Sequence, residues 1–245
     1  MRPSTFLFII AIIGLTPIKS YAQIACTTND LPCLFKTIEA EALKMNEPRW
    51  RNHAYRDLAV SKAMNGDIDG ATALIAKINN ADTQAMTIRA IGMAVAIHQN
   101  LPDDSYRSIF SQLDKSAQTI KDAGAKDIAY TYIAMAQAFA KLDDDATKTT
   151  LQMTNPALKH KAYGETAEIQ AERGNATAAL ASINAIDSDA FKNKALAIVS
   201  GIFLKRDEID TALSFAMKIE NPTKKISAIQ KIIDVRQGLN EEPKR

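Results

Sequence analysis

The chain has 245 residues, of which 47% are hydrophobic and only 6% aromatic, so it is long enough to form one or two globular domains. Lys and Arg number 30 against 28 Asp and Glu, and residues 1–22 contain two basic residues, Arg2 and Lys19, and no acid. The rest of the chain is therefore balanced in charge, which argues against a nucleic-acid partner because such proteins present a basic surface.

Residues 1–22 have the pattern of a secretory signal peptide. Arg2 precedes an apolar run from Phe6 to Leu15, and Ser20-Tyr21-Ala22 places small residues three and one before the expected cleavage point. The run falls short of the roughly 20 apolar residues that a membrane-spanning helix needs, and no later segment is apolar for long enough. We expect cleavage after Ala22, no transmembrane segment after cleavage, and an exported protein that is periplasmic if the source is bacterial and secreted otherwise.

Residues 23–47 contain the two cysteines, Cys26 and Cys33, on either side of a turn-rich stretch. In an oxidising compartment they are expected to form a disulfide that staples this N-terminal segment. A redox centre is disfavoured because the CxxC spacing is absent. A lipid anchor on Cys26 is a second alternative, although Gln23-Ile24-Ala25 lacks the leucine expected three residues before a lipoprotein cysteine. The first helix is expected from about Cys33 to Met45.

Residues 48–238 read as helix almost throughout, because alanine is abundant and apolar residues recur every three or four positions. One helical segment is repeated several times. Successive copies open at alanines spaced 36, 39, 33, 33 and 33 residues apart, namely Ala54, Ala90, Ala129, Ala162, Ala195 and Ala228. The two longer spacings predict insertions around residues 100–104 and 118–126. A last, unpaired helix is expected from about Pro222 to Arg236.

These copies resemble degenerate tetratricopeptide repeats. In that family an aromatic residue of the first helix packs beside a small residue four positions later, and another small residue begins the second helix. Three copies match this spacing: Tyr55-Ala59-Ala71, Tyr130-Ala134-Ala146 and Tyr163-Ala167-Ala179. Gly66 and Gly174 match the family's turn glycine, whereas Lys141 and Asp207 stand at that place in two other copies.

The resemblance implies an all-α fold, a right-handed solenoid of stacked helical hairpins with about five to six repeats over residues 48–238. A polar tail at residues 239–245 follows it. One hairpin is too small to bury its apolar face, and stacking joins these faces into a single elongated core.

Catalytic chemistry is not indicated by any motif. The sequence lacks the GxSxG turn, the phosphate-binding loop, the HExxH pair and the GxGxxG turn of common enzyme classes. Its three histidines, His53, His98 and His160, have no second ligand at a metal-site spacing, and His98 is expected to pack inside. We therefore expect no catalytic residue, no metal and no cofactor.

The function that the resemblance implies is binding of a protein or peptide segment on the concave face, which the first helices of successive repeats form. The family's ligand-contact positions predict eight residues in this face: Arg56, Arg89, Thr131, Met135, Phe139, Lys161, Glu168 and Lys194. The basic residues would select charge and Met135 with Phe139 would supply apolar contact, so an acidic-hydrophobic segment is the expected partner.

Two other functions stay open from the sequence. One is an accessory domain of an enzyme, or a cryptic enzyme, that acts on cell-envelope polymers. The other is a structural assembly subunit that uses the edges of the solenoid. Inward acidic or histidine residues in a deep pocket would favour the enzyme, whereas a broad groove with exposed apolar residues would favour binding.

Overall fold

The computed structural model describes residues 26–239. The predicted signal peptide (1–22) and the tail from residue 240 onward lie outside the described residues. Within residues 26–239 the chain forms twelve α-helices and no strand, which confirms the predicted all-α class. None of these helices is both long and apolar enough to cross a membrane.

The even-numbered helices have 15 to 18 residues. They are α2 (Pro48–Met64), α4 (Ala81–His98), α6 (Ala123–Phe139), α8 (Pro156–Glu172), α10 (Asp189–Lys205) and α12 (Pro222–Arg236). The odd-numbered helices are α1 (Leu31–Lys44), α3 (Ile68–Lys77), α5 (Asp103–Gln118), α7 (Asp143–Leu151), α9 (Ala176–Asn184) and α11 (Ile209–Met217). From α3 onward the odd-numbered helices have 9 or 10 residues, except α5, which has 16.

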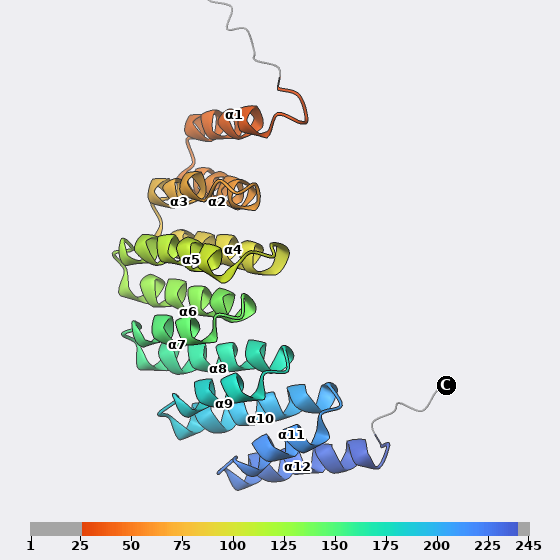
Figure 1. Ribbon diagram of the computed structural model, residues 1–245. Coiled ribbons are helices and arrows are strands. Elements are labelled where there is room, and N and C mark those ends of the chain that lie inside the picture. The colour runs from red at the N-terminus through yellow and green to blue at the C-terminus, as the bar shows by residue number, and fades with distance from the viewer. Residues whose placement is uncertain (1–25, 240–245) are drawn as a thin grey trace, which may run out of the picture.

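The helices form one elongated stack that runs in chain order from α1 to α12 (Figure 1). Each even-numbered helix from α2 to α10 packs on the next even-numbered helix, so these helices form a continuous row. Helices α3, α7, α9 and α11 pack mainly on the even-numbered helix that precedes them, whereas α5 lies against both α4 and α6. Each helix pair therefore contacts mainly its neighbours in the chain, which is the way helical repeat proteins are stabilised.

The helix starts define the register of the copies. The even-numbered helices begin at residues 48, 81, 123, 156, 189 and 222, which are 33 residues apart except for the step from 81 to 123. Counted from these starts, Thr87 is the equivalent of Ala54 and Ala129, so the predicted register of the second copy, at Ala90, is wrong by three residues. Burial agrees with the correction, because Thr87 is 0% exposed whereas Ala90 is partly exposed.

The extra residues of the second copy lie in α5 rather than in loops. The predicted insertions at residues 100–104 and 118–126 are therefore misplaced, since both regions contain only short connections on either side of α5. The longer α5 is stable as a helix because it buries an apolar stripe against α4 and α6. The stripe consists of Tyr106, Ile109, Phe110, Leu113 and Ala117.

The turns after four even-numbered helices share one backbone geometry. Gly66, Lys141, Gly174 and Asp207 follow α2, α6, α8 and α10 at the same place, and all have positive φ, at 82°, 65°, 79° and 61°. Glycine adopts this left-handed conformation without strain, whereas a residue with a side chain is less favourable there. The turn is thus repeated even where the sequence lacks the glycine.

Short polar side chains fix the starts of several helices. Asn155 and Asn221 precede prolines, and their Oδ1 atoms accept hydrogen bonds from the backbone N–H groups of Leu158 (3.1 Å) and Lys224 (3.0 Å). These caps satisfy amides that have no partner within the first helical turn. The last helix begins at Pro222 and ends at Arg236, as predicted.

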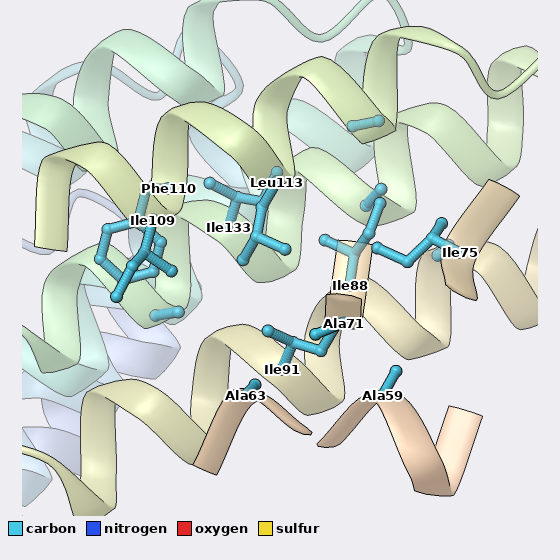
Figure 2. Packing of buried hydrophobic residues seen from close by; sticks show 14 of the residues in the cluster. Ala59, Ala63, Ala71, Ile75, Ile88, Ile91, Ile109, Phe110, Leu113 and Ile133 are labelled. Carbon is cyan, nitrogen blue, oxygen red and sulfur yellow. The ribbon is translucent and has the colours of Figure 1, made fainter. Parts of the chain in front are cut away.

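Small residues allow the helices to approach one another closely. Ala59 and Ala63 of α2 and Ala71 of α3 are each 0% exposed, and Figure 2 shows them gathered beside Ile88 and Ile91 of α4. Tight packing of this kind leaves no room for larger side chains at the alanine positions.

The corrected register also accounts for Gly92. It is the equivalent of Ala59 in α2 and Ala134 in α6, and an added Cβ at Gly92 would lie 3.2 Å from the Cβ of Ala136. The small position between packed helices is therefore filled in this copy by the smallest residue of all.

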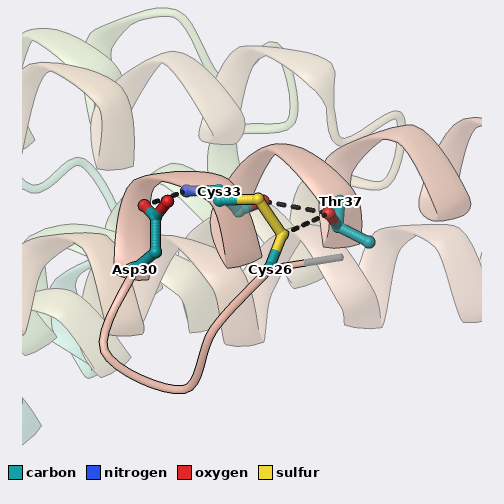
Figure 3. The surroundings of a disulfide bond; sticks show 4 residues. All are labelled: Cys26, Asp30, Cys33 and Thr37. Atoms are coloured by element: carbon teal, nitrogen blue, oxygen red, sulfur yellow. Dashed lines mark hydrogen bonds between the residues drawn. A yellow bond between two sulfur atoms is a disulfide. The ribbon is translucent and has the colours of Figure 1, made fainter. Parts of the chain in front are cut away.

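The N-terminal segment is held to α1 by a cysteine pair. The sulfur atoms of Cys26 and Cys33 lie 1.96 Å apart, at disulfide distance, as predicted (Figure 3). Asp30, inside this loop, caps α1 by accepting a hydrogen bond from the backbone N–H of Cys33 at 3.1 Å. The first helix runs from Leu31 to Lys44, two residues earlier at its start and one residue earlier at its end than predicted.

Candidate binding site on the even-numbered helices

The eight predicted site residues stand at only four places in the even-numbered helices. They are the sixth (Lys161, Lys194), ninth (Arg56, Arg89, Thr131), thirteenth (Met135, Glu168) and seventeenth (Phe139) residues of their helices. Steps of three or four residues follow one side of an α-helix, so these places share a face. We call the surface formed by these four places in α2, α4, α6, α8 and α10 the even-helix face.

One pocket in the even-helix face brings three of the predicted residues together. It lies between α8 and α10 and has a cavity volume of about 130 Å³. Its lining includes Lys161, Gly164, Glu168, Phe191, Lys194 and Ile198. The rings of His160 and Phe191 form part of its wall, with their centroids 5.7 Å apart. We call this cavity the α8–α10 pocket.

Two lysines and two glutamates line the α8–α10 pocket. The Lys161 ammonium is 3.6 Å from the carboxylate of Glu165, which partly neutralises it. Burial raises the pKa of the Glu168 carboxyl above its usual range, and the carboxylates of Glu165 and Glu172 raise it further, whereas Lys194 acts in the opposite direction. Glu168 is therefore a half-buried carboxylate whose charged form is disfavoured by its surroundings.

Arg56 and Arg89 lie on the even-helix face but away from this pocket. The guanidinium of Arg56 contacts the carboxylate of its neighbour Asp57 at 3.0 Å. The guanidinium of Arg89 lies 4.9 Å from the centroid of the Tyr132 ring, so α4 and α6 are linked by a cation–π contact across this face. Both basic groups are accessible, although each already has a partner.

Met135 and Phe139 supply a half-buried apolar band on α6. Both pack against a small cluster formed by Ala134, Ala138, Ala146 and Ile169, and both remain partly exposed. They therefore contribute to the core and to the surface between α6 and α8 at the same time.

Two other predicted positions differ from expectation. Thr131 is only 6% exposed, and its hydroxyl donates a hydrogen bond to the carbonyl oxygen of Asp127 at 3.0 Å, so the structure removes it from the candidate contacts. His98, expected to pack inside, is exposed at the end of α4. The ninth place thus differs in accessibility between copies, since Arg89 is exposed and Thr131 is buried.

A recurring set of buried polar residues was not found from the sequence. The fifth residues of α2, α6 and α10 are Asn52, Asp127 and Asn193, which are 4%, 1% and 7% exposed. Each accepts backbone hydrogen bonds from the segment just before the next even-numbered helix, with Asn79, Thr154 and Glu220 among the donors. The only available sequence signal was a short polar residue in an otherwise apolar stripe at equivalent places.

A second polar network connects the start of α7 with the end of α8. The Asp143 carboxylate accepts hydrogen bonds from Arg173 at 2.7 and 2.8 Å, from Gln170 at 2.9 Å and from Asn175 at 3.0 Å. These contacts join two successive helix pairs and explain the acidic run at residues 143–145 as structural in part. Among residues 26–239, no group of three or more His, Cys, Asp or Glu residues is placed to hold a metal ion.

Comparison with protein-family models gives no match, and comparisons with curated proteins and with solved structures give none either.

Proposed function

We propose that this chain is an exported, non-catalytic interaction scaffold, a right-handed tetratricopeptide-like solenoid that binds a protein segment along its even-helix face. The 33-residue recurrence of the helix starts and the repeated left-handed turns support a repeat array of this kind. In such an array the even-helix face is the concave one.

The observation that carries the proposal is the α8–α10 pocket. Lys161 and Lys194 hold the same place in successive helices, and packing of α8 on α10 brings them into one cavity with Glu168. Because the repeats are stacked, residues that are 33 positions apart in the sequence become neighbours along one surface. An extended protein segment can bind along such a row of residues.

Charge and apolar contacts are available along this surface. Arg56 and Arg89 stand toward the N-terminal end, Met135 and Phe139 in the middle, and the α8–α10 pocket toward the C-terminal end. The two arginines and the apolar band support an acidic-hydrophobic segment as the part of the partner that lies over α2 to α6.

Site-specific photo-crosslinking in the native compartment tests the proposal. Ile97 is 53% exposed on the even-helix face, at the place in α4 that Phe139 holds in α6, whereas Leu151 is 59% exposed on the odd-numbered helix α7. With a photoreactive phenylalanine at each place in turn, we expect a discrete protein adduct from position 97 and none from position 151. An adduct from position 151 alone would move the interface to the odd-numbered helices.

A second candidate function, a structural assembly subunit, is favoured by the apolar end of the stack. Helix α12 packs on α10 and α11, and its Ile226 and Ile233 are 68% and 41% exposed, while Met217 of α11 is 55% exposed. Analytical ultracentrifugation over a range of concentrations distinguishes the two functions. Reversible association that Ile226→Lys abolishes would favour assembly through this end, whereas a monomer at all concentrations would favour the scaffold.

A further inference from the structure

We propose that the α8–α10 pocket receives a single basic side chain, arginine or lysine, from the bound protein segment. The proposal rests on the proposed function and goes one step further, because it assigns the chemistry of the ligand at one place in the even-helix face.

The walls of the pocket suit a long side chain with an apolar stem. Phe191, Ala195 and Ile198 of α10 present hydrocarbon surface along one side. Arginine and lysine have three or four methylene groups that pack on such surface while the charged head lies beyond them. The rings of His160 and Phe191 additionally offer a surface on which a guanidinium can stack.

Glu168 is the group in the pocket that would attract a cation. The carboxylate of Glu168 lines the cavity and is repelled by the carboxylates of Glu165 and Glu172, while Lys194 is its attractive neighbour. Lys161 is already paired with Glu165. A cation beside Glu168 would relieve both the repulsion and the loss of hydration, whereas an anion would lie beside the two carboxylates that line the cavity, those of Glu165 and Glu168.

Gly164 opens the pocket on the α8 side. An added Cβ at this residue would have the Cβ of Ala195 as its nearest neighbour, at 3.9 Å, which is an ordinary van der Waals contact. A Cβ at Gly164 therefore meets no clash, and the substitution also removes a glycine from a helix interior, where glycine is unfavourable. We therefore expect that substitution of Gly164 fills the pocket without disrupting the fold.

Nuclear magnetic resonance titrations of the ¹⁵N-labelled protein test this assignment. The probes are three acetylated and amidated tripeptides with alanine at both ends and arginine, citrulline or glutamate in the centre. We expect the arginine probe to shift the amide signals of Gly164 and Ala195 and to bind about fivefold more tightly than the citrulline probe, the ratio that one partly exposed ion pair gives. Equal binding of arginine and citrulline, or tighter binding of glutamate, would overturn the assignment.

Three variants locate the binding. Gly164→Met fills the pocket with a flexible side chain and should weaken the arginine probe at least about fivefold, while Glu168→Gln should bring arginine and citrulline within about twofold of each other. Ala181→Met adds a similar side chain on the exposed part of α9 and should leave binding unchanged. If Gly164→Met binds as the wild type does, the pocket is not the site.

The crosslinking at Ile97 separates this inference from the proposed function. A partner that crosslinks at the even-helix face while the arginine probe fails to bind would overturn the basic side chain and leave the scaffold standing. Crosslinks confined to the odd-numbered helices would overturn the scaffold itself, and with it the inference that rests on it.

Discussion

The carboxylate of Asp127 in α6 binds both the backbone and the side chain of Thr154, which lies near the end of the connection between α7 and α8. The Asp127 carboxylate accepts the backbone N–H of Thr154 at 3.0 Å and its hydroxyl at 3.1 Å, and it also accepts the N–H of Asn155 at 2.7 Å. These bonds fix the distance between an even-numbered helix and the start of the next one, so they help to set the spacing of the stack.

Asp127→Ala is expected to lower the free energy of unfolding by about 1–3 kcal/mol, because it leaves two amides of the connection, in a partly buried place, without their acceptor. Asp127→Asn keeps an acceptor oxygen and should lose less. Urea unfolding measures both, with the exposed Asp144→Ala as a control that should stay within about 0.5 kcal/mol of the wild type. Equal losses for the alanine and asparagine variants would contradict the role of these hydrogen bonds.

Two glycine-to-alanine substitutions should have opposite effects on stability. Neither Gly66 nor Gly201 has an atom within 4 Å of an added Cβ, but Gly66 has a φ of +82° whereas Gly201 lies inside α10. Gly66→Ala should lower the free energy of unfolding by about 1–2 kcal/mol because of left-handed strain, and Gly201→Ala should raise it by about 0.5–1 kcal/mol. Thermal or urea unfolding that shows the same sign for both would mean that backbone conformation is not the deciding factor.

Ala134→Leu and Ala167→Leu should each destabilise the fold by about 1–3 kcal/mol, because both alanines are 0% exposed between packed helices and have no space for a larger side chain. Ala181→Leu makes the same change at an exposed place in α9 and should have little effect. Denaturant unfolding curves check the difference. Wild-type stability in both core variants would place these residues outside tight helix contacts.

Glu168→Gln should stabilise the folded protein at neutral pH by roughly 0.5–1 kcal/mol. The pKa of Glu168 is raised in the folded state, mainly by burial. The Glu168 carboxyl therefore adds to the free energy of unfolding when it is protonated, and this contribution is lost as the pH rises through the raised pKa. The advantage of the glutamine variant should therefore shrink as the pH falls toward 4.5, the ordinary pKa of a glutamate side chain. Unfolding of both proteins measured between neutral and acidic pH checks the trend, which a pH-independent difference would contradict.

Cys26→Ser with Cys33→Ser should loosen α1 while the rest of the stack stays folded. Closing this loop is expected to contribute about 2.5 kcal/mol by restricting the unfolded segment, and α1 packs on α2 at the end of the row. Hydrogen exchange should therefore become faster in α1 and stay unchanged in α8. Intact mass with and without reductant checks the cysteine pair in the wild type, and it also tests the expected cleavage after Ala22, because the mass shows where the chain begins.

Local signals were sufficient for the helical class and for several helix boundaries. The N-cap and proline at Asn221-Pro222 act within one turn of their own helix, so the start of α12 could be read directly from neighbouring residues. The pairing of Cys26 with Cys33 could be predicted for the same reason, since the two residues are only seven positions apart.

The register of the second copy and the site were decided by contacts between distant residues. Ala90 and Thr87 are both compatible with a helix, and only the packing of α4 against α6 and the long α5 selects Thr87 for the buried place. The sequence alone placed Lys161, Glu168 and Lys194 on helices of similar pattern. Their meeting in one pocket depends on how α8 packs on α10, because side chains 26 or more residues apart become neighbours only when the helices that carry them are stacked.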